Sequence, residues 1–81
     1  MTRDEALDLV CDAIRRIVPD ADFGTVGLDE PFRDALELDS LDFLTLVETL
    51  TKRTGVRIDE DDYPKLTTLS TCADFLVSQV G

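Results

Sequence analysis

The sequence contains no histidine. Histidine is the usual general base near neutral pH and the commonest metal ligand in proteins. Its absence excludes Ser-His and Cys-His catalytic pairs, and the glycine–x–serine–x–glycine nucleophile elbow is also missing. A serine that takes part in chemistry here must be activated by a group outside this chain. We therefore predict that the protein is not an enzyme.

Basic residues are scarce: eight lysines and arginines stand against 18 aspartates and glutamates, which gives a net charge of −10. Such a surface repels the phosphates of nucleic acids and anionic lipids, and it attracts basic patches on other proteins. No apolar run approaches the roughly 18 residues that a membrane-spanning helix needs. Residues 1–5 lack the charged-then-apolar order of a signal peptide. We expect a cytoplasmic monomer that binds neither nucleic acid nor membrane.

Cysteine is represented only by Cys11 and Cys72, both within apolar helical patterns, which predicts two small core residues rather than a disulfide framework. The acidic run 59–62 invites comparison with a calcium loop. That loop needs glycine at its sixth position and glutamate at its twelfth, where this chain has Pro64 and Ser70. The run is better explained as the acidic first turn of a helix, so no metal site is predicted.

Two long helices are predicted from apolar residues that recur at three- and four-residue steps. The first spans about residues 2–18 and opens on a capping box formed by Thr2 and Glu5. The second spans about residues 39–54, with Asp39 as its natural N-cap. Both patterns place one apolar stripe along a helix, which is the face expected to pack in a core.

The C-terminal part predicts two further helices after a C-cap at Gly55. A short helix follows from residue 59 and reaches Lys65 at most, and a longer one spans about residues 71–80. We therefore predict an all-α fold in which residues 1–81 form a single domain. The fold is a small four-helix bundle of three longer helices and one short third helix. The core candidates of the last helix are Ala73, Leu76, Val77 and Val80.

The long connection 20–38 is predicted to be an ordered loop, because a structureless segment of this length is uncommon in a compact domain. Asp29 and Pro31 indicate a short helical turn, with Asp29 as N-cap and Pro31 inside its start. Apolar anchors are spread along the connection: Phe23, Val26, Leu28, Phe32 and Leu36.

The chain is organised around residues 36–44, where Ser40 stands between Asp39 and Asp42 at the start of the second helix. This segment combines a hydroxyl group, a helix start and apolar flanks. Because no base in the chain can activate the hydroxyl, Ser40 is interpreted as a point of covalent attachment.

The same residues resemble the prosthetic-group site of acyl carrier proteins. Leu38-Asp39-Ser40-Leu41-Asp42 matches the signature of that family, and the likeness extends over nearly the whole chain. The second helix shares its apolar positions, and the C-terminal half shares an apolar residue before an acidic short helix. These further matches are Leu46, Val47, Leu50, Ile58 and residues 66–69.

The resemblance implies that a phosphopantetheinyl transferase attaches 4′-phosphopantetheine to Ser40. Asp39 would help hold the magnesium ion of that transferase, and Leu41 completes the cofactor site. The implied partners are acyl-loading, synthase and transferase enzymes with basic surface patches. The residues that such partners would recognise are Asp42, Leu44, Thr45, Glu48 and Lys52.

The interior of the bundle is expected to shelter part of an acyl chain, because each buried methylene stabilises by about 0.8 kcal/mol. A few carbons then favour burial while leaving it reversible. In a thin bundle these positions also serve as ordinary core. The candidate lining residues are Leu46, Val47, Leu50, Ile58 and Leu66.

Some positions depart from the family pattern. Glu37 stands where the family usually has glycine, three residues before the serine, so the backbone there is expected to turn differently. Lys52 and Arg53 give the far end of the second helix a mixed charge, which should weaken binding to partners built for an acidic stripe. These two residues also suit a helix C-terminus, and both explanations stay open.

The expected function is an acyl carrier that serves fatty-acid, polyketide or specialised lipid biosynthesis, with the departures favouring a dedicated pathway. Two alternatives remain. One is an aminoacyl or peptidyl carrier, against which the acidity weighs mildly. The other is an unmodified acidic helical adaptor that binds basic partners.

Overall fold

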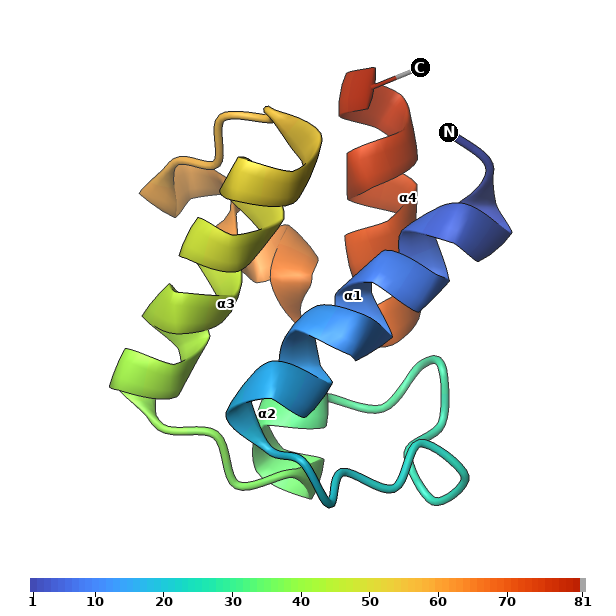
Figure 1. The fold of residues 1–81 in the computed structure, drawn as a ribbon, viewed down its shortest axis with the longest axis vertical. Helices are drawn as coiled ribbons and strands as arrows, with labels where there is room; N and C mark the ends of the chain where they lie inside the picture. Colours follow the sequence, from blue (N-terminus) through green and yellow to red (C-terminus); the bar gives the residue numbers. More distant parts are fainter. Residues whose placement is uncertain (81) are drawn as a thin grey trace.

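The computed structural model describes residues 1–80, and these form a helical bundle (Figure 1). Three longer helices make its frame: α1 (Arg3–Ile17), α3 (Ser40–Thr54) and α4 (Leu69–Val80). A short helix α2 (Phe32–Ala35) lies in the long connection, and a 3-10 helix η1 (Glu60–Leu66) joins α3 to α4. The predicted all-α bundle with three longer helices and a short third one is confirmed. None of the described helices is long and apolar enough to cross a membrane.

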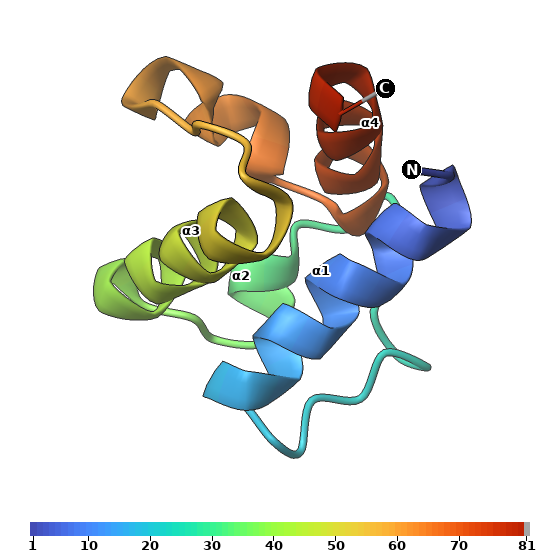
Figure 2. The ribbon, with the colours of Figure 1, turned by 45° about the horizontal axis from the view of Figure 1, so that its top comes forward.

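The helices pack around α1, which contacts both α3 and α4, while η1 packs against α4 (Figure 2). Their buried side chains form one continuous core, to which every element contributes. The fully buried larger side chains are Val10, Ile14, Phe32, Leu46, Leu50, Leu66, Cys72 and Leu76. Because so few elements share this core, the position of each one depends strongly on the others.

The predicted capping chemistry of α1 and α3 is confirmed. Thr2 and Glu5 form a reciprocal capping box at α1, and the hydrogen bonds from Thr2 lower the pKa of the Glu5 carboxyl. Helix α3 ends at Thr54 and has Gly55 as its C-cap, whose φ of 74° is a left-handed conformation that glycine adopts at little steric cost. Both ends of α3 are therefore set by local sequence.

The long connection is ordered and fastened to the bundle, as predicted. Val26 is buried, the Ser70 N–H donates to the Leu28 carbonyl over 3.0 Å, and Pro31 pairs with Thr68 in an isolated β-bridge. Leu28, which was predicted as an apolar anchor, is 48% exposed and is held through its backbone instead. In Figure 1 this green segment passes below α1 and leads into α3. The connection thus brings α2 beside the start of α3.

Helix α2 begins later than predicted. It starts at Phe32, and Pro31 takes the N-cap position in an extended conformation without a side-chain cap; Asp29 does not cap it. The reason is tertiary: Phe32 is fully buried, and its N–H donates to the Thr67 carbonyl over 3.2 Å. Contacts with the η1–α4 connection therefore fix where this turn begins.

The C-terminal boundaries also differ from the prediction. Helix α4 starts at Leu69 rather than residue 71, because the Thr68 hydroxyl accepts the Thr71 N–H over 3.1 Å and so caps the helix earlier. Helix η1 runs one residue beyond Lys65. Of the predicted core residues in α4, Val77 is half-buried and Val80 is 41% exposed. Cys72 is buried as expected, and Cys11 is only partly buried.

Candidate functional site

Ser40 is the first residue of α3, and its side chain is exposed. The preceding Asp39 is the N-cap, and its carboxylate accepts the Asp42 N–H over 2.8 Å. The Asp42 carboxylate in turn accepts the Asp39 N–H over 3.4 Å. The two acids that flank Ser40 are therefore directed at backbone amides, which leaves the hydroxyl accessible at the helix start. This capping role of Asp42 adds to the partner role predicted for it, and the three-residue spacing of the two acids signals it.

The segment that leads into Ser40 ends α2 in a Schellman motif. The Leu38 N–H donates to the Arg33 carbonyl over 2.9 Å, and the Glu37 N–H donates to the Asp34 carbonyl over 3.4 Å. Glu37 has a φ of 55°, the one positive φ among the described residues other than glycine. Leu38 follows it and is buried. This turn fixes the direction in which the chain enters α3.

Glu37 therefore keeps the left-handed turn that glycine favours, and our expectation that the backbone turns differently from a glycine-type conformation is wrong. An L-residue in this conformation carries a steric cost of about 1–2 kcal/mol, while glycine carries an entropic cost of about 0.5–1 kcal/mol. The steric cost of Glu37 is larger than the entropic cost that glycine would carry there. The sequence therefore retains backbone strain beside Ser40.

Glu37→Gly is expected to raise the free energy of unfolding by about 0.5–1 kcal/mol. For a domain of this size, about 1 kcal/mol corresponds to a rise of roughly 4–8 °C in the melting temperature. Thermal unfolding followed by circular dichroism measures this shift. Glu48→Gly is the matched control, because Glu48 is exposed within α3, where the same change should cost about 0.5–1 kcal/mol. A lower melting temperature for Glu37→Gly would contradict the strain at this position.

The exposed face of α3 carries two leucines near Ser40. Leu41 is 73% exposed and Leu44 is 43% exposed, whereas Phe43, Leu46, Val47 and Leu50 on the other face are buried. Large apolar side chains exposed so close to an accessible hydroxyl are typical of a contact surface for another protein. Farther along the same helix, the predicted recognition residues Thr45, Glu48 and Lys52 are also exposed.

Arg53 has a structural partner. Its guanidinium lies 2.7 Å from the Asp12 carboxylate on α1, and this contact lowers the pKa of Asp12. The pair joins α1 to the last turn of α3. Of the two basic residues at this end of α3, Arg53 is therefore paired with α1, and Lys52 presents its charge on the exposed surface.

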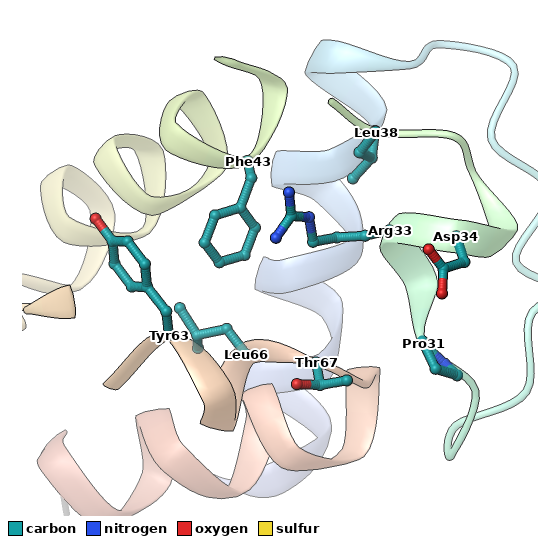
Figure 3. A pocket seen from close by; sticks show the side chains of 8 residues that line it. All are labelled: Pro31, Arg33, Asp34, Leu38, Phe43, Tyr63, Leu66 and Thr67. Atoms are coloured by element: carbon teal, nitrogen blue, oxygen red, sulfur yellow. The ribbon is translucent and has the colours of Figure 1, made fainter. Parts of the chain in front are cut away.

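A cavity of about 260 Å³ opens between α2, α3 and η1 (Figure 3). Leu38, Phe43 and Leu66 give it apolar walls, and the Phe43 and Tyr63 rings meet edge to face with centroids 5.2 Å apart. The cavity lies close to Ser40 along the chain, since Leu38 precedes that serine by two residues and Phe43 follows it by three. The remaining lining residues are Pro31, Arg33, Asp34 and Thr67.

The residues predicted to shelter an acyl chain are distributed over the core rather than gathered at this cavity. Leu66 lines the cavity and is fully buried, and Leu46 and Leu50 are fully buried between helices. Val47 is 7% exposed and Ile58 is half-buried against the core. The sequence pattern missed Arg33, Leu38, Phe43 and Tyr63, because their meeting depends on how α2 and η1 pack against α3.

The sequence matches a protein-family model and two curated relatives. The family model described as the phosphopantetheine attachment site matches residues 4–76. The acyl carrier protein of Tropheryma whipplei strain Twist is 33% identical over 72 residues, which covers 85% of this chain and 88% of the relative. The corresponding protein of strain TW08/27 matches to the same extent.

The chain belongs to the acyl carrier protein family. Members of this family are phosphopantetheine carriers rather than catalysts, and they interact with synthase and transferase enzymes. The site fits that prosthetic group, because the one serine at the start of α3 is exposed and its neighbouring carboxylates are turned to the backbone. Residues 1–80 hold no cluster of three or more cysteine, aspartate or glutamate side chains that could bind a metal ion.

Proposed function

We propose that this protein carries acyl groups on a 4′-phosphopantetheine arm attached to Ser40. The observation that carries this proposal is the exposed Ser40 side chain at the first position of α3. The backbone amides at a helix start carry partial positive charge, which favours a phosphodiester there. Because Asp39 and Asp42 stay close to these amides, the phosphate is expected to point outward.

Attachment is a phosphoryl transfer in which Ser40 is the acceptor. Its Oγ forms a bond to the phosphorus of the arm, the pyrophosphate bond of coenzyme A breaks, and adenosine 3′,5′-bisphosphate leaves. The proton of the hydroxyl passes to a base of the transferase, since this chain has no histidine to accept it. By likeness to the family, Asp39 would help hold the magnesium ion of that transferase, and its carboxylate would then have to leave the Asp42 N–H that it accepts here. When bound, the arm supplies a thiol that holds acyl groups as thioesters and moves them between enzymes.

The exposed leucines support a role for α3 in partner recognition. Leu41 and Leu44 offer an exposed apolar contact in the same helix as Ser40, and Glu48 offers a negative charge to basic patches of a partner. Lys52 breaks the acidic character of this surface at its far end. These features favour a dedicated polyketide or specialised lipid pathway over general fatty-acid synthesis.

The cavity beside the first turn of α3 supports sheltering of the acyl group. Its walls of Leu38, Phe43 and Leu66 suit methylene groups, each of which stabilises by about 0.8 kcal/mol on burial. A short acyl chain would therefore be held reversibly. The buried residues Leu46, Val47 and Leu50, with the half-buried Ile58, extend this apolar environment into the core.

Incubation with coenzyme A, magnesium and a broad-range phosphopantetheinyl transferase should add the mass of one 4′-phosphopantetheine group. Ser40→Ala should remove this gain completely, because no other hydroxyl stands at the start of α3. Intact-mass spectrometry measures both results. Ser78→Ala is the matched control, since Ser78 is exposed on α4, far along the chain from the attachment segment. A wild-type protein that gains no mass, or a gain that survives Ser40→Ala, would overturn the proposal.

A further inference from the structure

Arg33 occupies an unusual position in the cavity. It belongs to α2 and is half-buried, and the carbon at the centre of its guanidinium lies 4.5 Å from the centroid of the Phe43 ring. Figure 3 shows its side chain reaching across the cavity toward that ring, between Phe43 and Leu38. The guanidinium is permanently charged. A positive charge therefore stands against the apolar wall close to the attachment serine.

The charge of Arg33 is not matched by an anion of the protein. Within residues 1–80, no ion pair or side-chain hydrogen bond of Arg33 is found, although the chain carries a net charge of −10. Asp34 also lines the cavity, but among the described residues its carboxylate forms no ion pair with Arg33.

The space beside Arg33 suits a short chain. A volume of about 260 Å³ leaves room for a short chain beside the guanidinium. Leu38, Phe43 and Leu66 would contact methylenes, and the guanidinium would face whatever lies at the end of such a chain. A terminal methyl would leave that charge without a partner. A terminal carboxylate could accept two charge-assisted hydrogen bonds from it.

We propose that this cavity selects acyl groups that end in a carboxylate, with Arg33 as the specificity-determining residue that binds this carboxylate. The inference rests on the proposed carrier function, because the cargo reaches the cavity from an arm on Ser40. The chemical class is a short-chain dicarboxylic acid joined to the arm through one of its carboxyl groups.

The test compares hexanoyl and adipoyl groups, which have chains of equal length but end in a methyl and a carboxylate. Each is loaded onto Ser40 from its coenzyme A thioester by the transferase, and loading is checked by intact mass. Cleavage of the thioester by hydroxylamine is then measured relative to the same acyl group on coenzyme A. Relative cleavage of the adipoyl form should be about five- to tenfold slower than that of the hexanoyl form. The adipoyl form should also have the higher melting temperature.

Arg33→Gln should remove the difference between the two cargoes. Arg57→Gln is the matched control, because it makes the same change in charge at a side chain that is 88% exposed and lies outside the cavity. It should leave the difference intact. Thermal unfolding of the unloaded variants shows whether each retains the fold.

The other possible outcomes distinguish a failure of cargo selection from a failure of the carrier function. Equal relative cleavage of both cargoes in the wild-type protein would overturn the selection, as would better protection of the hexanoyl form. If Arg33→Gln accelerates both cargoes equally, Arg33 acts on the arm or the cavity wall, and the inference fails while the carrier function stands. If Ser40 accepts neither group, the proposed function fails first.

Discussion

Phe32→Ala should reduce the free energy of unfolding by about 3–5 kcal/mol. Phe32 is fully buried, and it is the one buried residue of the four-residue helix α2. Truncation removes its apolar contacts and leaves a cavity that the fastened connection cannot easily close. A loss of this size is a large part of the roughly 5–15 kcal/mol that stabilises a small domain. Urea unfolding measures it as a lower midpoint with an unchanged slope.

Phe23→Ala is the matched control in the same connection. Phe23 is only half-buried, and its ring is covered on one side by Arg15, whose guanidinium carbon lies 4.9 Å from the ring centroid. The same truncation should cost about 1 kcal/mol there. Similar losses for both variants would mean that α2 is not held in place by Phe32.

Phe32 matters to the candidate site because α2 carries two of the residues that line the cavity, Arg33 and Asp34. Arg33 lies next to it, and the Schellman motif at Glu37 and Leu38 directs the chain into α3. Loss of the Phe32 anchor should therefore release both the cavity wall and the turn before Ser40. Stability and function are linked at this residue through the placement of one short helix.

The helix ends that could be predicted from the sequence are those set by local chemistry. Thr2 caps α1 through its own first turn, and Asp39 and Gly55 delimit α3 through hydrogen bonds and dihedral preferences of neighbouring residues. The position of Ser40 at the start of α3 could be predicted for the same reason, because it directly follows the N-cap Asp39.

The features that escaped prediction depend on contacts between distant segments. The start of α2 is set by the burial of Phe32 and by the bridge between Pro31 and Thr68, and neither leaves a local signature. The apolar pattern of α4 correctly predicts that Leu76 is buried. It does not show that the neighbouring helices leave Val80 at the end of α4 uncovered. The meeting of Arg33 with Phe43 likewise follows from the packing of α2 against α3.

The two cysteines bear on how a thioester survives on this protein. A thiolate can take an acyl group from a thioester, and burial suppresses the thiolate. Burial raises the pKa of Cys72 to about 12, and it also raises the pKa of the partly buried Cys11. Neither thiol of the chain should therefore compete for the cargo at neutral pH. The thiol of the arm is left as the reactive one.

The same pKa shift predicts that stability falls in alkaline solution. Above its ordinary pKa of 9.0, Cys72 loses its proton in the unfolded chain but keeps it in the folded one up to about pH 12. The unfolded state then binds fewer protons, so the free energy of unfolding decreases as pH rises through this window. This one group should contribute a loss of about 1.4 kcal/mol per pH unit, approaching about 4 kcal/mol by pH 12.

Cys72→Ala should be less stable than the wild-type protein at pH 7, because it removes a fully buried sulfur atom. Its stability should nevertheless decline less steeply between pH 9 and pH 11, and the two curves should converge or cross. Urea unfolding at each pH measures the difference between the two proteins, which differ in no other side chain. Cys11→Ala should retain most of the wild-type slope, since Cys11 is only partly buried. Parallel curves for the wild-type protein and Cys72→Ala would show that the Cys72 thiol titrates alike in the folded and unfolded states.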